Sequence, residues 1–276
     1  MISRRLFAAA LALATALALA FLLLPLIAIF LRVPPGDLVA QLGSEVVIDA
    51  LVVTAKTTLI AQALILVVGT PAAYLIASRR FRGRPFVITL VELPLVLPPA
   101  VAGIALFAAF GRLGLLGSTF DALGFTVALT PAAVVLAVTY VASPFYLRQA
   151  IASFEALDRS LLDASRTLGA GPARTFFRVA LPLASNGLAA GAALSFARGI
   201  GEFGATIMFA GSLQGVTQTL SLAIYAQFDL HLETALALGA LLVVTSAMIL
   251  LLVKLIPSWT RWTSTSPSPF ARFGSS

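Results

Sequence analysis

Two oppositely charged residues stand four positions apart inside a long apolar stretch. Arg198 and Glu202 lie in the segment 183–209, and on a helix this spacing places both on one face, where they can pair. Charge inside an apolar segment is costly and is usually functional. The pair either fixes helix packing or lines a gate for a charged solute. Phe203 and Thr206 follow it and join the candidates, although packing of small residues explains this segment equally well.

Two further ionisable residues lie in apolar segments. Lys56 stands about ten residues into the segment 46–77. Its long side chain can reach outward to the membrane surface, or it can offer a cation to a passing anion. Glu92 precedes Pro94 and belongs either to a packing network or to a pathway; the sequence leaves both readings open.

The chemistry of most enzyme classes is missing from the sequence. The chain has no Cys and one His, which argues against a zinc site and against a cysteine nucleophile. It has no phosphate-binding loop of the G-x-x-x-x-G-K-[ST] type, no G-x-S-x-G and no H-E-x-x-H. We therefore predict no catalytic residue, no metal site and no cofactor in this chain.

Composition points to a membrane protein. Of 276 residues, 60% are hydrophobic and 11% are charged, and the mean hydropathy is +1.03; soluble domains carry about 25% charged residues. Apolar runs long enough to cross a bilayer predict an all-α, polytopic protein with six transmembrane helices. The expected spans are approximately 6–31, 46–77, 86–110, 127–147, 183–209 and 233–257. Prolines in the third and small residues in the fifth suggest positions inside the bundle.

The positive charges predict the topology. Of the eighteen Lys and Arg residues, fourteen fall on one side of this six-span arrangement, two (Arg32 and Arg112) on the other, and two within spans. By the positive-inside rule, both termini and the loop 148–182 are cytoplasmic. This distribution explains the net charge of +7 without a nucleic-acid partner. We expect the chain to cross a prokaryotic cell (inner) membrane several times.

The termini complete the predicted organisation. The first apolar run resembles a signal peptide, but its length favours a retained helix. We expect an N-terminal helix with an external linker over 1–45, a core over 46–257, and a disordered cytoplasmic tail over 258–276, where the sequence is rich in Pro and Ser.

The loop between the fourth and fifth spans has the pattern of two short amphipathic helices. Apolar residues recur at helical spacing on one stripe, namely Leu157, Leu161, Ala164 and Leu168. Gly169 is typical of a helix C-terminal stop, and Pro172 of the first turn of the next helix, which we expect to end at Pro182. The loop either lies on lipid headgroups or docks a cytoplasmic partner.

The same stretch resembles the EAA loop of importer-type ABC transporter permeases. That pattern reads E-A-A, three residues, Gly, nine residues, I-x-L-P. Here Asp163-Ala164-Ser165 precedes Gly169 by three residues, and Val179-Ala180-Leu181-Pro182 follows after nine; Asp, Ser and Val are the departures. The resemblance implies a type I importer fold and a coupling helix that docks on a separate ATPase subunit. The docking residues would be Leu157, Leu161, Leu162, Asp163, Ala164, Arg166, Thr167, Leu168 and Gly169.

Within this family the chain looks most like permeases for molybdate or tungstate. "LPLVLPPAVAG" and "FARGIGEFGATIMFAG" carry the likeness; the related sulfate/thiosulfate permeases read closer to Gly-Glu-Tyr-Gly-Ser at 201–205. The resemblance implies a dimer of permeases, an ATPase dimer that binds ATP and Mg, and an extracytoplasmic molybdate-binding protein. The alternatives are a sulfate permease, a transporter without an ATPase, and a membrane-anchored structural protein.

Overall fold

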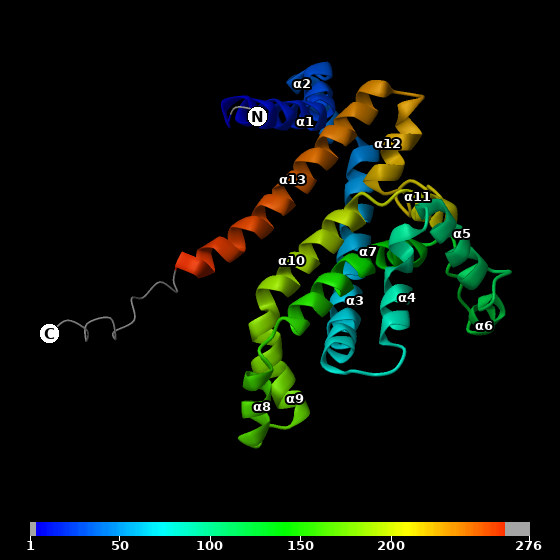
Figure 1. The fold of residues 1–276 in the computed structure, drawn as a ribbon. Helices are drawn as coiled ribbons and strands as arrows, with labels where there is room; N and C mark the ends of the chain where they lie inside the picture. The colour runs from blue at the N-terminus through cyan, green and yellow to red at the C-terminus, as the bar shows by residue number, and fades with distance from the viewer. Residues whose placement is uncertain (1–3, 263–276) are drawn as a thin grey trace. The chain divides into compact units, whose positions relative to one another are not determined.

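The computed structural model describes residues 4–262, and all regular elements in this range are helical (Figure 1). The helices are α1 (Arg4–Arg32), α2 (Pro35–Leu42), α3 (Glu45–Ser78), α4 (Arg84–Val96), α5 (Pro99–Phe110), α6 (Gly117–Ala122), α7 (Pro131–Glu155), α8 (Arg159–Thr167), α9 (Pro172–Thr175), the π-helix η1 (Phe176–Ala180), α10 (Leu181–Ile200), α11 (Gly204–Ala210), α12 (Leu220–Phe228) and α13 (Leu232–Trp262).

The helices account for the predicted membrane spans. Five stretches are long and apolar enough to cross a bilayer: Arg4–Arg32, Glu45–Ser78, Pro131–Glu155, Pro172–Ile200 and Leu232–Leu251. The pair α4 and α5 passes the same test together, although it is bent by 113°. The prediction of an all-α polytopic protein is confirmed, with six spans when the bent pair counts as one.

The predicted third span, 86–110, is present as two helices, α4 and α5, that meet at a bend. It breaks at Leu97 and Pro98, whose ψ angles of 135° and 133° are extended. Each of these residues precedes a proline, and the ring of a following proline disfavours the helical conformation. The expected burial is also only half right. Ala102, Gly103 and Leu106 of α5 are buried, whereas α4 has no buried residue.

The predicted fifth span, 183–209, is likewise interrupted. The helix ends at Ile200, and α11 begins at Gly204. The break has a local cause, because the carboxylate of Glu202 accepts a hydrogen bond from the backbone N–H of Ala205 at 2.8 Å and so caps α11 rather than continuing α10.

The chain divides into two compact units. The larger comprises residues 55–211 and 246–276. Within it α7 and α10 pack closely because glycines leave room: a β-carbon at Gly187 would overlap Ser153, and one at Gly191 would meet Gln149 at 2.9 Å. The hydroxyl groups of Tyr146 on α7 and Thr70 on α3 lie 2.5 Å apart. These contacts make α7 the centre of the unit.

The smaller unit comprises residues 1–54 and 212–245. Its core joins Val47 and Ala50 to Leu220, Ala223 and Leu238, and Thr54 accepts a hydrogen bond from the N–H of Leu220 at 2.8 Å. In α1 none of the described residues is buried. The division predicted at 45/46 and 257/258 stays a prediction. Residues 258–262 end α13, and the rest of the predicted tail lies outside the described residues.

Candidate functional site

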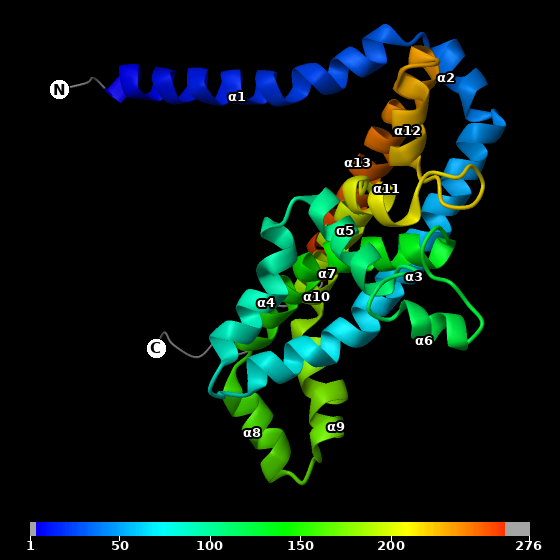
Figure 2. The same cartoon turned by 90° about the vertical axis from the view of Figure 1, so that its right-hand side faces the viewer.

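The loop between α7 and α10 forms a helical hairpin of α8 and α9 at one end of the larger unit (Figures 1 and 2). Asp158 caps α8, because its carboxylate accepts a hydrogen bond from the backbone N–H of Ser160 at 2.9 Å. Hydrogen bonding from this N–H, and then from the Ser160 side chain, lowers the pKa of Asp158 below its ordinary 3.8. The cap is therefore made by the charged carboxylate.

Gly169 ends α8 as the sequence predicted. Its φ of +82° is left-handed. Its N–H donates to the carbonyl of Arg166 at 2.9 Å, and the N–H of Ala170 donates to that of Ser165 at 3.0 Å. These two bonds make up a Schellman motif. A second link, between the hydroxyl groups of Ser165 and Thr175 at 2.9 Å, joins the two arms of the hairpin.

The second arm differs from its prediction. It does not end at Pro182, because α9, η1 and α10 follow one another without a break from Pro172 to Ile200. Pro182 has no N–H to bond the fourth residue before it. The helix widens here instead: in the π turn, the N–H of Leu181 donates to the carbonyl of Phe176, five residues back. The hairpin is thus continuous with a membrane-spanning helix.

The predicted apolar stripe divides between two surfaces. Leu157, which precedes α8, and Leu162 pack, together with Phe176, on the core cluster that includes Phe154, so the stripe was wrong in placing Leu157 with the outward residues. Leu161, Ala164 and Leu168 are exposed, and Leu168 is 88% accessible. These three residues form the outward face of the hairpin.

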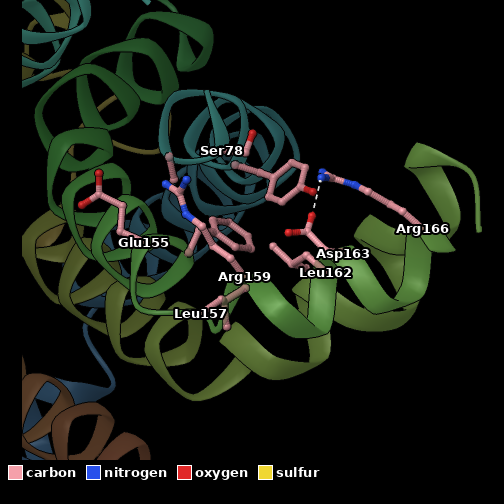
Figure 3. Close-up of a pocket in the computed structure, with 10 residues that line it drawn as sticks. Ser78, Glu155, Leu157, Arg159, Leu162, Asp163 and Arg166 are labelled. Carbon is pink, nitrogen blue, oxygen red and sulfur yellow. Dashed lines mark hydrogen bonds and ion pairs between the residues drawn. The ribbon is translucent and has the colours of Figure 1, made fainter. Parts of the chain in front are cut away.

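The inner side of α8 borders a pocket against the ends of α3 and α7. Figure 3 shows Leu162, Asp163 and Arg166 of α8 across from Ser78 and Glu155. Asp163 and Arg166 form an ion pair at 3.1 Å, and the Thr167 hydroxyl donates to the carbonyl of Asp163 at 3.0 Å. The pair is exposed on both sides, so it contributes little stability.

Arg198 and Glu202 form the ion pair that their spacing predicted. Nη2 of Arg198 lies 2.6 Å from Oε2 of Glu202, whose side chain is 1% exposed. The other carboxylate oxygen caps α11 through Ala205. Phe203 is half-buried at the break, and Thr206 is fully buried, with no hydrogen-bond partner for its hydroxyl among the described residues. The pair therefore fixes the junction between α10 and α11.

This junction meets the bend between α4 and α5. A β-carbon at Gly204 would lie 2.8 Å from that of Pro99, and one at Gly103 would lie 2.6 Å from the carbonyl oxygen of Ala205. Backbone approach this close requires glycine at both positions. The two broken spans thus pack against each other at their breaks.

The remaining candidates lie apart from this junction. Lys56 is exposed on α3. Glu92 on α4 pairs with Arg148 on α7 at 3.1 Å. Arg148 was expected in the loop, but α7 continues to Glu155.

A second ion pair between the same helices, Arg84 on α4 with Glu155 on α7, was not predicted either. The order of the charged residues along the two helices could have predicted both ion pairs. Arg precedes Glu by eight residues on α4 and by seven on α7, so an antiparallel packing brings opposite charges together twice.

Residues 65–262 match the model of a family described as binding-protein-dependent transport system inner membrane component. This range contains the hairpin and both broken spans. The chain belongs to this family. It is therefore a membrane component of a transport system.

Similar proteins include several permeases. The chain is 42% identical over 231 residues to the molybdenum transport system permease protein ModB of Mycobacterium tuberculosis, covering 84% of this chain and 88% of that one. It is 33% identical over 248 residues to a sulfate transport system permease protein of Synechocystis, covering 88% and 89%.

Solved structures of ABC transporters share the fold. A bacterial alginate ABC transporter matches with a TM-score of 0.68 at 19% identity, covering 91% of this chain and 94% of that one. The inward-facing methionine ABC transporter matches with a TM-score of 0.60 at 20% identity, covering 76% and 93%. The predicted importer fold is confirmed.

Proposed function

We propose that the chain is the membrane-spanning subunit of an ATP-driven importer for molybdate, with tungstate as a related substrate. The hairpin of α8 and α9 carries the transport part of this proposal. It presents an outward apolar face, and its arms lead directly into α7 and α10. The identity to permeases named for molybdenum supports the substrate.

The outward face of the hairpin would dock a separate ATPase subunit that binds ATP and Mg. The contact would involve Leu161, Ala164 and Leu168, with Asp163, Arg166 and Thr167 at its rim and Gly169 holding the turn. Leu157 and Leu162 would support α8 from the core side. Apolar side chains surrounded by charge are typical of a docking surface. No cofactor is proposed for this chain itself.

The proposed orientation follows the positive-inside rule. Both termini and the hairpin would be cytoplasmic, in a prokaryotic inner membrane. Two copies would form the path, since six spans are half of the usual twelve, and an extracytoplasmic binding protein would deliver the anion. The region 46–257 would form the permease core, and 1–45 would be an appended helix and linker.

The path would pass the junction between α5 and α11. Arg198, Glu202, Phe203 and Thr206 are its proposed gate residues, because they lie where both spans are broken. Glu92 and Lys56 would lie along or beside the path. ATP binding would draw the ATPase subunits together, and the hairpins would turn the path outward to receive anion. ATP hydrolysis would return the path to its inward-open state.

Uptake of molybdate tests the proposal. Cells that express the chain with its ATPase and binding-protein partners are given nanomolar molybdate with excess sulfate. Uptake should require the chain and should resist sulfate. A Leu161→Asp/Leu168→Asp variant should insert normally but lose uptake and coupled ATP hydrolysis. Arg82→Ala, in the exposed connection before α4, controls for general damage.

Other outcomes assign other functions. If excess sulfate abolishes molybdate uptake and sulfate itself accumulates, the chain is a sulfate permease, as its likeness to the Synechocystis protein would allow. Uptake that needs no ATPase would overturn the docking role of the hairpin. Absence of any uptake would contradict the transport proposal.

A further inference from the structure

Two ion pairs join α4 to α7 along one seam. Arg84 at the start of α4 pairs with Glu155 at the end of α7, and Glu92 pairs with Arg148 at 3.1 Å. The pairs are eight residues apart on α4 and seven on α7, which correspond to about 12 Å and about 10 Å of helix. The two separations match, so both pairs form at once.

The seam begins next to the hairpin. Glu155 is the last residue of α7, and Asp158, three residues on, caps α8. Arg84 is also fixed from α3, because its Nε donates to the carbonyl of Ile76 at 3.0 Å. A displacement of the hairpin therefore reaches Glu155 and Arg84 first.

The other end of the seam leads to the broken spans. Glu92 lies within α4 before the bend at Leu97 and Pro98, and α5 follows the bend. The α5 helix then contacts α11 at Gly103 and Gly204. The hairpin thus reaches this contact by two routes: through α10 directly, and through α7, the ion pairs, α4 and α5.

Apolar contacts and ion pairs together hold α4. It has no fully buried residue, but its half-buried Val87 and Ile88 pack on the core cluster around α7. The ion pairs are partly exposed, so each contributes modestly to stability. Their main effect is to fix the register of α4 along α7, because both pairs form together in only one alignment of the two helices.

We propose that Arg84–Glu155 and Glu92–Arg148 act as a strap that makes α4 move with α7, so that displacement of the hairpin repositions α5 against α11. The four are positioning residues for transport and need not touch the anion. The inference rests on the proposed function. It adds a second mechanical route from the hairpin to the gate.

Charge reversal and exchange test the strap in the reconstituted complex with its ATPase and binding protein. Arg148→Glu should lower molybdate uptake per ATP hydrolysed by about two- to fivefold, while ATP hydrolysis persists. The exchange Glu92→Arg/Arg148→Glu should restore the ratio. Asp121→Arg, which reverses a charge in the ion pair of Arg112 and Asp121 outside the seam, and Arg82→Glu in the exposed connection before α4, should leave it unchanged.

A second measurement does not depend on transport. The chain has no Cys, so spin labels can be placed at Leu90 on α4 and Ala152 on α7 alone. The distance distribution should be narrow in the parent chain, broad with Arg148→Glu and narrow again in the exchange variant.

An unchanged distribution with Arg148→Glu would overturn the strap, as would loss of ATP hydrolysis in parallel with uptake. A strap that behaves as expected in the label measurement while the parent complex takes up no anion would instead contradict the proposed function.

Discussion

Gly169 and Asp158 define the two ends of α8, and each acts through a single backbone feature. Gly169 supplies a left-handed φ of +82°, and Asp158 supplies a charged cap. Neither residue is buried, so replacing either one changes the ends of α8 without changing the packing of the core. They therefore show whether the shape of the hairpin, rather than its mere presence, governs coupling.

Gly169→Val should uncouple the transporter without preventing insertion. A β-branched residue at positive φ costs about 1–2 kcal/mol, which loosens the last turn of α8. Stimulated ATP hydrolysis in the assembled complex should fall severely.

Gly171→Val is the matched control for this change. Gly171 stands two residues away with φ of −67°, and no atom lies within 4 Å of the position that its β-carbon would take. Equal loss in both variants would contradict a role for the left-handed turn.

The Asp158 cap has a defined pH dependence. Because its pKa in the folded chain lies below the ordinary 3.8, the cap stabilises α8 fully above 3.8 and is lost as the pH falls through the lowered value. Amide exchange over residues 159–163 should therefore be equally protected from neutral pH down to about pH 5.

Variants at position 158 check this assignment at neutral pH. Asp158→Ala should speed exchange of these amides, whereas Asp158→Asn, which keeps an acceptor oxygen, should speed it less. Loss of protection in the parent chain well above 3.8 would show that another group controls α8.

At the scale of elements, the shortest helix of the junction depends most on its neighbours. The seven residues of α11 are too few to form a stable helix alone. Their support comes from the Glu202 cap and from the close contact with α5. The ion pair with Arg198 in turn holds Glu202 in place.

Glu202→Ala should destabilise this junction strongly. The change leaves Arg198 unpaired and the N–H of Ala205 without its acceptor. Removing one partner of a buried ion pair lowers the free energy of unfolding by about 3–5 kcal/mol. Glu202→Gln keeps the acceptor and should cost less. Thermal unfolding in detergent should rank the parent chain above Gln and Gln above Ala; a Gln variant as unstable as Ala would assign the stability to the ion pair alone.

Element boundaries show where sequence reasoning succeeds and fails. The helix stop at Gly169 and the pairing of Arg198 with Glu202 follow from local spacing, and both are confirmed. The break at Leu97 and the continuation through Pro182 were missed, although each depends on proline. At Leu97 and Pro98, two successive prolines each disfavour the helical conformation of the residue before them, whereas the single Pro182 follows a π turn that keeps the helix continuous. The ion pairs of α4 and α7 required knowledge of which helices are neighbours.

At the scale of the larger unit, two series of connected helices link the hairpin to the contact between α5 and α11. The hairpin continues into α10 on one side and follows α7 on the other, and the two sides meet again where α11 packs on α5. In Figures 1 and 2 the hairpin lies at one end of this unit, and α5 and α11 lie away from it. A displacement at the hairpin therefore arrives at one contact from two directions.

The π turn at Phe176–Ala180 sets how the helix face before it is rotated relative to the helix face after it. An α-helix advances about 100° per residue, and a π turn accommodates one residue more than an α turn. Thr175 before it faces Ser165 of the hairpin, and Gly187 after it faces Ser153 of α7. Deleting one residue within the π turn would leave an α turn in its place and keep the two faces in phase, whereas inserting one residue in the regular helix after it would rotate one face by about 100° relative to the other. The chain can therefore lose a residue at this one place more easily than it can gain one elsewhere along the segment.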